Sequence, residues 1–168
     1  MKDTTIVGSA TPSKVEPFRT VIEEAARLTA TLGFSITSGG GQGMSSIFLS
    51  EYFSAGGKHA RIFLPHQENM EAYGDKVDTK ATELIYTDLD YPRRNIMMVE
   101  NSQRVLAITG GLGTLTECIH GIYDFHVPLA VYEPSDIAKT LHSIPECENK
   151  FTSYKSQQEL ENWLRKER

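Results

Sequence analysis

Residues 104–124 read RVLAITGGLGTLTECIHGIYD, an apolar run that breaks at a glycine-rich turn and continues into a helical pattern carrying Glu117. The run Arg104–Ile108 predicts a buried strand, and the glycines predict a tight turn that opens directly into a helix. Backbone N–H groups at a helix start have no acceptor within the helix and lie at its positive end, so a phosphate fits there when glycines allow close approach. This junction therefore predicts an anion site with a carboxylate one turn away.

The same alternation of short apolar runs and helical patterns extends in both directions, which is typical of strand–helix–strand units in a mainly parallel sheet. We expect strands over 4–7, 34–38, 59–64, 84–87, 104–108 and 128–132. The predicted fold class is α/β, a single Rossmann-like domain over residues 1–168 with a doubly wound sheet of about six to seven strands and helices on both faces.

The helices are placed by their start and stop signals. Ser13 with Glu16 has the pattern of a capping box that begins a helix running to Leu32, and Ser156 with Glu159 has the same pattern before the C-terminal helix. Further helices are expected from 44 to the glycines at 56–57, over 91–100 and after 111. Residues 66–80 show no clear period and predict a long loop with one helical turn.

Composition excludes several classes of function. The chain has 168 residues and a formal net charge of −5, so nucleic acid is not an expected partner. Cys118 and Cys147 show no spacing typical of a metal site, no histidine has ligand spacing, and we expect no metal. No apolar run approaches the roughly 20 residues of a membrane helix, and no signal region precedes the first strand. We expect a reduced, cytoplasmic protein without membrane contact.

A parallel sheet places every strand-to-helix turn at its carboxyl edge, so four polar segments should meet there: residues 8–13, 38–46, 88–95 and 109–117. Gly8 and Gly39 lie in the first two turns. The glycines permit phosphate contact, Arg94 offers a fork of donors to phosphate or ribose, and Glu117 offers negative charge. This combination favours a nucleotide monophosphate as the ligand.

Each of these signals also has a structural interpretation. The glycines can serve tight turning alone, Glu117 can stabilise its own helix through the dipole, and Arg93 and Arg94 can be surface charges after Pro92. NAD is disfavoured because residues 111–116 lack the third glycine of a dinucleotide fingerprint, and neither glycine cluster continues into the Lys-Ser or Lys-Thr of a P-loop.

The segment GGLGTLTE at 110–117, with Arg94 upstream, resembles the Gly-Gly-x-Gly-Thr-x-x-Glu signature of the LOG family. Members of that family are cytokinin-activating or nucleotide 5′-monophosphate phosphoribohydrolases, long described as lysine decarboxylases. The resemblance covers about residues 5–132. A decarboxylase role is poorly supported here, because the chain has no recognisable pyridoxal-phosphate lysine motif.

The resemblance implies a catalytic pair, Arg94 and Glu117, acting on AMP or an N6-modified AMP, with no cofactor and a homodimeric assembly. It also implies a phosphate and nucleotide site, and a substrate pocket beside it. The phosphate and nucleotide residues are Gly8, Ser9, Gly39, Gly40, Gly41, Gly110, Gly111, Leu112, Gly113 and Thr114. The pocket residues are Arg93, Asn95 and Met98.

The implied reaction cleaves the bond between base and ribose through an oxocarbenium-like transition state. We expect Glu117 to be held ionised by the helix start and by Arg94, so that it stabilises the cationic C1′ or aligns the attacking water. No general acid is evident, since Asp88 and Asp90 are only near in sequence.

Two positions depart from the family pattern. Thr109 stands where plant-type members have proline, and Asn95 replaces the lysine that usually follows the arginine. Arg94-Asn95 is closer to a sister group that includes proteins similar to molybdenum-cofactor carriers, which bind a phosphate-bearing pterin without hydrolysing it. A non-catalytic nucleotide or molybdenum-cofactor carrier is therefore the alternative function.

Overall fold

The computed structural model describes residues 2–74 and 80–166. Within them, seven strands form one parallel sheet in the order β4-β3-β2-β1-β5-β6-β7. The strands are β1 (Asp3–Val7), β2 (Ser35–Ser38), β3 (Ala60–Leu64), β4 (Glu83–Tyr86), β5 (Val105–Ala107), β6 (Leu129–Tyr132) and β7 (Thr152–Tyr154). The predicted α/β class with a doubly wound parallel sheet is confirmed.

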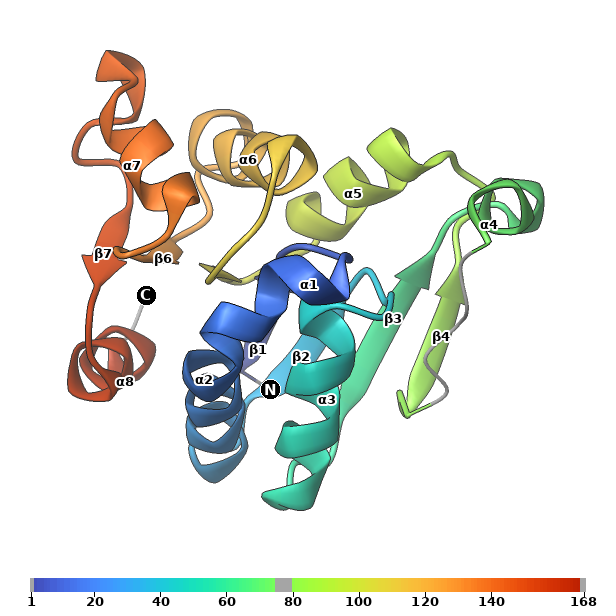
Figure 1. Cartoon of the computed structure of the whole chain (residues 1–168), viewed down its shortest axis with the longest axis horizontal. Coiled ribbons are helices and arrows are strands. Elements are labelled where there is room, and N and C mark those ends of the chain that lie inside the picture. The colour runs from blue at the N-terminus through green and yellow to red at the C-terminus, as the bar shows by residue number, and fades with distance from the viewer. Residues whose placement is uncertain (1, 75–79, 167–168) are drawn as a thin grey trace.

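Helices cover both faces of this sheet (Figure 1). The α-helices are α1 (Pro12–Val15), α2 (Arg19–Thr31), α3 (Met44–Ser54), α4 (Gln67–Tyr73), α5 (Tyr91–Glu100), α6 (Leu112–Ile119), α7 (Asp136–His142) and α8 (Gln157–Arg165). The short elements are η1 (Glu16–Phe18), η2 (His120–Asp124), a π-helical continuation of α6, and η3 (Pro145–Cys147).

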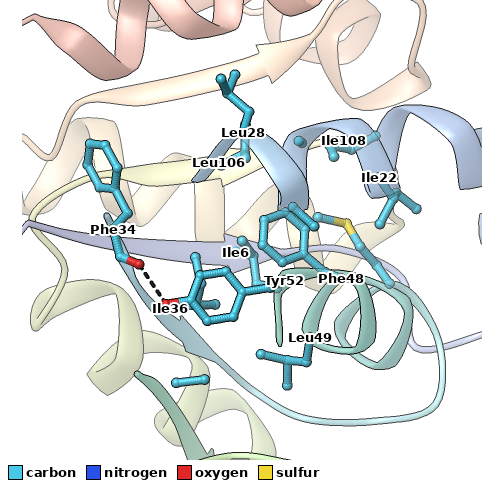
Figure 2. Close-up of a cluster of buried hydrophobic side chains, with 14 of the residues drawn as sticks. Ile6, Ile22, Leu28, Phe34, Ile36, Phe48, Leu49, Tyr52, Leu106 and Ile108 are labelled. Carbon is cyan, nitrogen blue, oxygen red and sulfur yellow. Dashed lines mark hydrogen bonds between the residues drawn. The ribbon is translucent and has the colours of Figure 1, made fainter. Parts of the chain in front are cut away.

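The alternation of side chains along each strand divides the core into two layers. In β1, Ile6 packs with α2, α3 and α8, whereas Val7 packs with α5, α6 and α7 on the other face. Figure 2 shows the first layer, where the Tyr52 hydroxyl of α3 donates a hydrogen bond of 2.7 Å to the carbonyl oxygen of Phe34. Both faces are thus closed, and the carboxyl edge of the sheet is left for a site.

The helix expected over 13–32 is divided into α1, η1 and α2. Pro17 is the cause, because its ring would clash with the carbonyl four residues earlier in a continuous helix. The capping box expected at Ser13 and Glu16 is wrong: the N-cap is Thr11, two residues before Ser13, and Pro12 begins the helix. The capping box of Ser156 and Glu159 is confirmed.

Two further differences concern short elements. β7 was not predicted, because it has only three residues and two of them, Thr152 and Ser153, are polar; Tyr154 is its one buried residue. Within the loop expected over 66–80, α4 occupies 67–73, and residues 75–79 lie outside the described part of the chain. Every helix within residues 2–74 and 80–166 is too short or too polar to span a bilayer.

Candidate functional site

A cleft of about 340 Å³ lies at the carboxyl edge of the sheet. All four predicted turns contribute to it: residues 8–11 after β1, 38–41 after β2, Tyr91, Arg94 and Asn95 on α5, and Gly111, Gly113, Thr114 and Glu117 on α6. The volume is that of a small-molecule site. The prediction that these four segments meet is therefore confirmed.

Close backbone approaches hold the first turn, after β1, against the second turn, after β2, and against the fourth turn, before α6. The amide of Ser9 donates to the carbonyl of Thr109 over 3.1 Å, and the carbonyl of Ser9 accepts from the Met44 amide at the start of α3 over 2.9 Å. A β-carbon on Gly43 would lie 2.1 Å from the Ser9 carbonyl oxygen, so only glycine allows this approach. Part of the glycine pattern thus serves packing between turns rather than ligand contact.

The start of α6 is open toward the cleft. Gly111 is its N-cap, and no side chain of the described residues caps the helix. A β-carbon on Gly111 or Gly113 would meet no atom within 4 Å, so the turn presents bare backbone. Gly110 and Leu112 do not line the cleft: Gly110 packs under Thr114, and Leu112 is 83% exposed. The amides at 112–114 have no acceptor within the helix, and their role as an anion site stays a prediction.

Glu117 points into this cleft from α6 and is only 7% exposed. Burial raises the pKa of its carboxyl from 4.5 to about 8, although the nearby Arg94 charge lowers it. The expectation that Glu117 is held ionised is therefore wrong for the free protein at pH 7. One guanidinium and a helix start do not replace the hydration that the carboxylate loses on burial.

Arg94 reaches the cleft from α5 and is 6% exposed. Asp90 begins the helix as its N-cap, accepting a hydrogen bond of 2.9 Å from the Arg93 amide. The Arg94 guanidinium carbon lies 5.4 Å from the centre of the Tyr91 ring. A β-carbon on Gly39 would lie 1.8 Å from Nη1 of Arg94, so the absence of a side chain at Gly39 makes room for the guanidinium.

The other predicted residues divide into two groups. Asn95 and Met98 line the cleft, whereas Arg93 does not. The Arg93 side chain is 75% exposed, and its Nε lies 3.8 Å from Oδ2 of Asp90. Asp88 is exposed and also lies outside the lining, so neither aspartate supplies an acid to the cleft.

Several residues that line the cleft were not among the predicted site residues. Ser38 and Ser45 share a hydroxyl–hydroxyl hydrogen bond, and Oγ of Ser38 accepts from the Gly40 amide over 3.0 Å. Lys14 on α1 also lines the cleft, and it lies one residue beyond the predicted turn at residues 8–13. Tyr91 also lines it, and its place at the start of an Arg-containing helix is the one signal that could have indicated this.

The charge of the cleft differs from that of the whole chain. Among its lining residues, Lys14 and Arg94 are cationic and Glu117 is the one carboxyl group. With Glu117 protonated, the cleft has two positive charges on a chain whose formal net charge is −5. The described residues contain no group of three His, Cys, Asp or Glu side chains that could hold a metal ion. The arrangement is suited to binding a small anion.

Comparison with known proteins agrees with this architecture. A model of the SLOG cluster4 family matches residues 2–161. A search of curated proteins found no match.

Three similar solved structures illustrate the range of relatives. The structural genomics target TM1055 is 21% identical with a TM-score of 0.82, and the match covers 95% of this chain and 96% of that one. The molybdenum cofactor carrier protein of Chlamydomonas reinhardtii is 16% identical with a TM-score of 0.79, covering 96% and 94%. DNA processing protein A of Helicobacter pylori, which binds single-stranded DNA, is 17% identical with a TM-score of 0.70, covering 97% and 80%. At these identities the likeness shows the fold.

Proposed function

Because this chain belongs to the SLOG cluster4 family, we propose that it is a nucleotide 5′-monophosphate phosphoribohydrolase of the LOG type. Its substrate is AMP or an N6-modified AMP, and its products are the free base and ribose 5-phosphate. The observation that carries the proposal is the burial of Arg94 and Glu117 in the cleft that also contains the open start of α6. A phosphate at that helix start would hold the attached sugar near both side chains.

In this proposal the phosphate is an anchor rather than a reacting group. The amides at the start of α6 donate to its oxygens, and the positive end of the helix adds to the attraction. The binding energy gained there fixes the glycosidic bond relative to Glu117, which is how contacts remote from the reacting atoms accelerate a reaction.

In this proposal the protonated Glu117 is the general acid that could not be identified from the sequence. As the bond between C1′ and the base nitrogen breaks, the base keeps the electron pair and takes the proton of Glu117. The carboxylate left behind faces the cationic C1′ and accepts a proton from the water that attacks it. Glu117 returns to its starting state, and one water molecule has been consumed.

Arg94 has two roles in this cycle. Its positive charge stabilises the carboxylate that forms on Glu117, since opposite charges in a buried cleft interact strongly. Its guanidinium can also donate to a ribose hydroxyl or to the phosphate. Gly39 keeps the space that the guanidinium occupies.

The test is release of free base from AMP, N6-substituted AMP and other nucleoside monophosphates, followed by chromatography. We expect release by the wild-type protein and a loss of about 10²-fold or more in kcat for Glu117→Gln, the order expected for one acid–base group. Glu100→Gln, at an exposed residue of α5, is the matched control. If the wild-type protein releases base from none of these nucleotides, the proposal is wrong.

The alternative function is carriage of a nucleotide or of a phosphate-bearing pterin without hydrolysis. Asn95 favours it, because this residue lines the cleft where LOG-type members have lysine. Mass spectrometry of the ligand released from gently purified protein separates the two functions. An intact cofactor indicates carriage, whereas ribose 5-phosphate indicates hydrolysis. The homodimer implied by the family stays a prediction that a measurement of solution mass would check.

A further inference from the structure

Tyr91 lines the cleft beside Arg94 and takes no part in the chemistry proposed above. It is the first residue of α5, and Arg94 follows one turn later on the same helix. Side chains three residues apart on a helix are neighbours, so the ring and the guanidinium can meet. The guanidinium carbon lies 5.4 Å from the centre of the Tyr91 ring, which is within the range of a cation–π contact.

The Arg94 guanidinium is bounded by Gly39 as well as by Tyr91. A β-carbon on Gly39 would lie 1.8 Å from Nη1 of Arg94 and 3.0 Å from its guanidinium carbon. Arg94 is 6% exposed, so its long side chain is enclosed rather than free in solvent. A side chain with several rotatable bonds keeps one position only where its neighbours define it. The Tyr91 ring is one of these neighbours, and the Gly39 backbone is another.

Tyr91 is itself held by neighbouring groups. Asp90, the residue before it, is the N-cap that begins α5. Tyr73 of α4 packs edge-on with Tyr91, with ring centres 5.3 Å apart and ring planes at 87°. α4 lies beside the start of α5 (Figure 1), and the His66 amide before α4 donates over 2.7 Å to the Leu89 carbonyl. Tyr73 is 75% exposed, so its contact with Tyr91 does not serve the packing of the core.

We propose that Tyr91 is a positioning residue, whose ring holds the Arg94 guanidinium close to Glu117, and that Tyr73 supports the ring. The inference rests on the proposed function for what the guanidinium does during the reaction. The placement of the guanidinium is a property of the free protein and can be measured without turnover.

Glu117 reports where the charge of Arg94 lies. In the free protein this charge lowers the pKa of the Glu117 carboxyl, which burial raises. Coulomb attraction falls with distance, so a guanidinium that moves away leaves the pKa of Glu117 higher than about 8. Water admitted by a smaller side chain would change the pKa in the opposite direction, because it relieves the desolvation of the carboxylate. The sign of the change therefore separates a displaced charge from a loosened cleft.

The experiment follows the carboxyl carbon of Glu117 by NMR from pH 5 to 10, in the full chain without ligand. Its resonance is assigned by its absence in Glu117→Gln. Tyr91→Leu removes the aromatic ring, Tyr91→Phe keeps it, and Tyr73→Leu removes its support. Tyr86→Leu is the control, at an exposed tyrosine that does not line the cleft. The kcat for AMP is measured on the same proteins.

We expect Tyr91→Leu to raise the pKa of Glu117 and to lower kcat about tenfold, the factor that corresponds to a cation–π contact in a partly buried site. Tyr91→Phe should keep both values close to those of the wild-type protein, and Tyr73→Leu should change both in the same direction by less. An unchanged or lower pKa in Tyr91→Leu, or an equal rise in Tyr91→Phe, would overturn the inference.

The two readouts also separate this inference from the proposed function. If no nucleotide is hydrolysed but Tyr91→Leu still raises the pKa of Glu117, the function is wrong and the inference stands. If AMP is hydrolysed and Tyr91→Leu changes neither the pKa nor kcat, the function stands and the inference is wrong. A fall in kcat without a rise in the pKa also counts against the inference, because Tyr91 would then act other than through Arg94.

Discussion

The raised pKa of Glu117 affects the stability of the fold as well as the proposed chemistry. Burial raises the pKa of this carboxyl from 4.5 to about 8 in the folded protein. At a pH between these two pKa values, Glu117 keeps its proton in the folded protein and has released it in the unfolded chain. The contribution of Glu117 to stability is therefore full below pH 4.5 and is lost as the pH rises through about 8. Because the folded carboxyl is already half ionised at pH 8, the free energy of unfolding should fall by about 3.5 kcal/mol from this group between pH 5 and 8, at 1.36 kcal/mol per pH unit.

Glu117→Gln removes the titration while keeping the size and polarity of the side chain. Between pH 5 and 8, we expect the stability of the variant relative to that of the wild-type protein to rise by about 3.5 kcal/mol, while its activity is lower. The assay is urea unfolding at unit steps from pH 5 to 9, with Glu100→Gln as the exposed control. Parallel pH profiles for the wild-type protein and Glu117→Gln would show that the carboxyl is ionised in the folded state, and would refute both this prediction and its role as an acid.

Three other substitutions test the placement of single groups. Gly39→Ala should displace the Arg94 guanidinium, since the added carbon would lie 1.8 Å from Nη1. We expect activity to fall about tenfold or more while the melting temperature changes little. Unchanged activity would contradict this placement of Arg94. Arg104→Met should destabilise the fold by about 2–4 kcal/mol, because Nη1 of Arg104 donates a hydrogen bond of 2.7 Å to the Leu164 carbonyl at the end of α8. Urea unfolding measures this loss, and the activity per folded molecule should stay the same. Ser156→Ala removes the N-cap of α8 and should cost about 1 kcal/mol by the same assay.

Local sequence signals were sufficient for most of the fold. The strands before Gly8, Gly39 and Gly110 are short apolar runs that end at turn residues, and these were placed within one or two residues. The rule that parallel strands end at one edge then brought Arg94 and Glu117 together without any knowledge of distance. Periodicity and topology are both properties of the chain that need no packing detail.

The missed features depend on packing or on neighbouring residues. The polar pattern of Ser13 and Glu16 was overridden by Pro12 and Pro17, which fix where a helix can begin and continue. The pKa of Glu117 could not be predicted, because it depends on how far the helices and the sheet exclude water from the carboxyl. Lys14 was missed because it lies on a separate short helix rather than in a glycine turn.

The glycines at the carboxyl edge of the sheet differ in what they do. Gly43 permits two turns to approach, Gly39 makes room for the Arg94 guanidinium, and Gly111 presents bare backbone to the cleft. These are three different physical roles in one sequence pattern. In the proposed function, the phosphate contacts the bare backbone that follows Gly111, and neither Gly39 nor Gly43.

The most direct measurement is a crystal structure of Glu117→Gln with AMP bound. We expect phosphate oxygens within about 3 Å of the amides at residues 112–114, with the glycosidic bond lying between residue 117 and Arg94. A phosphate bound elsewhere, or a sugar that lies away from these two side chains, would contradict it.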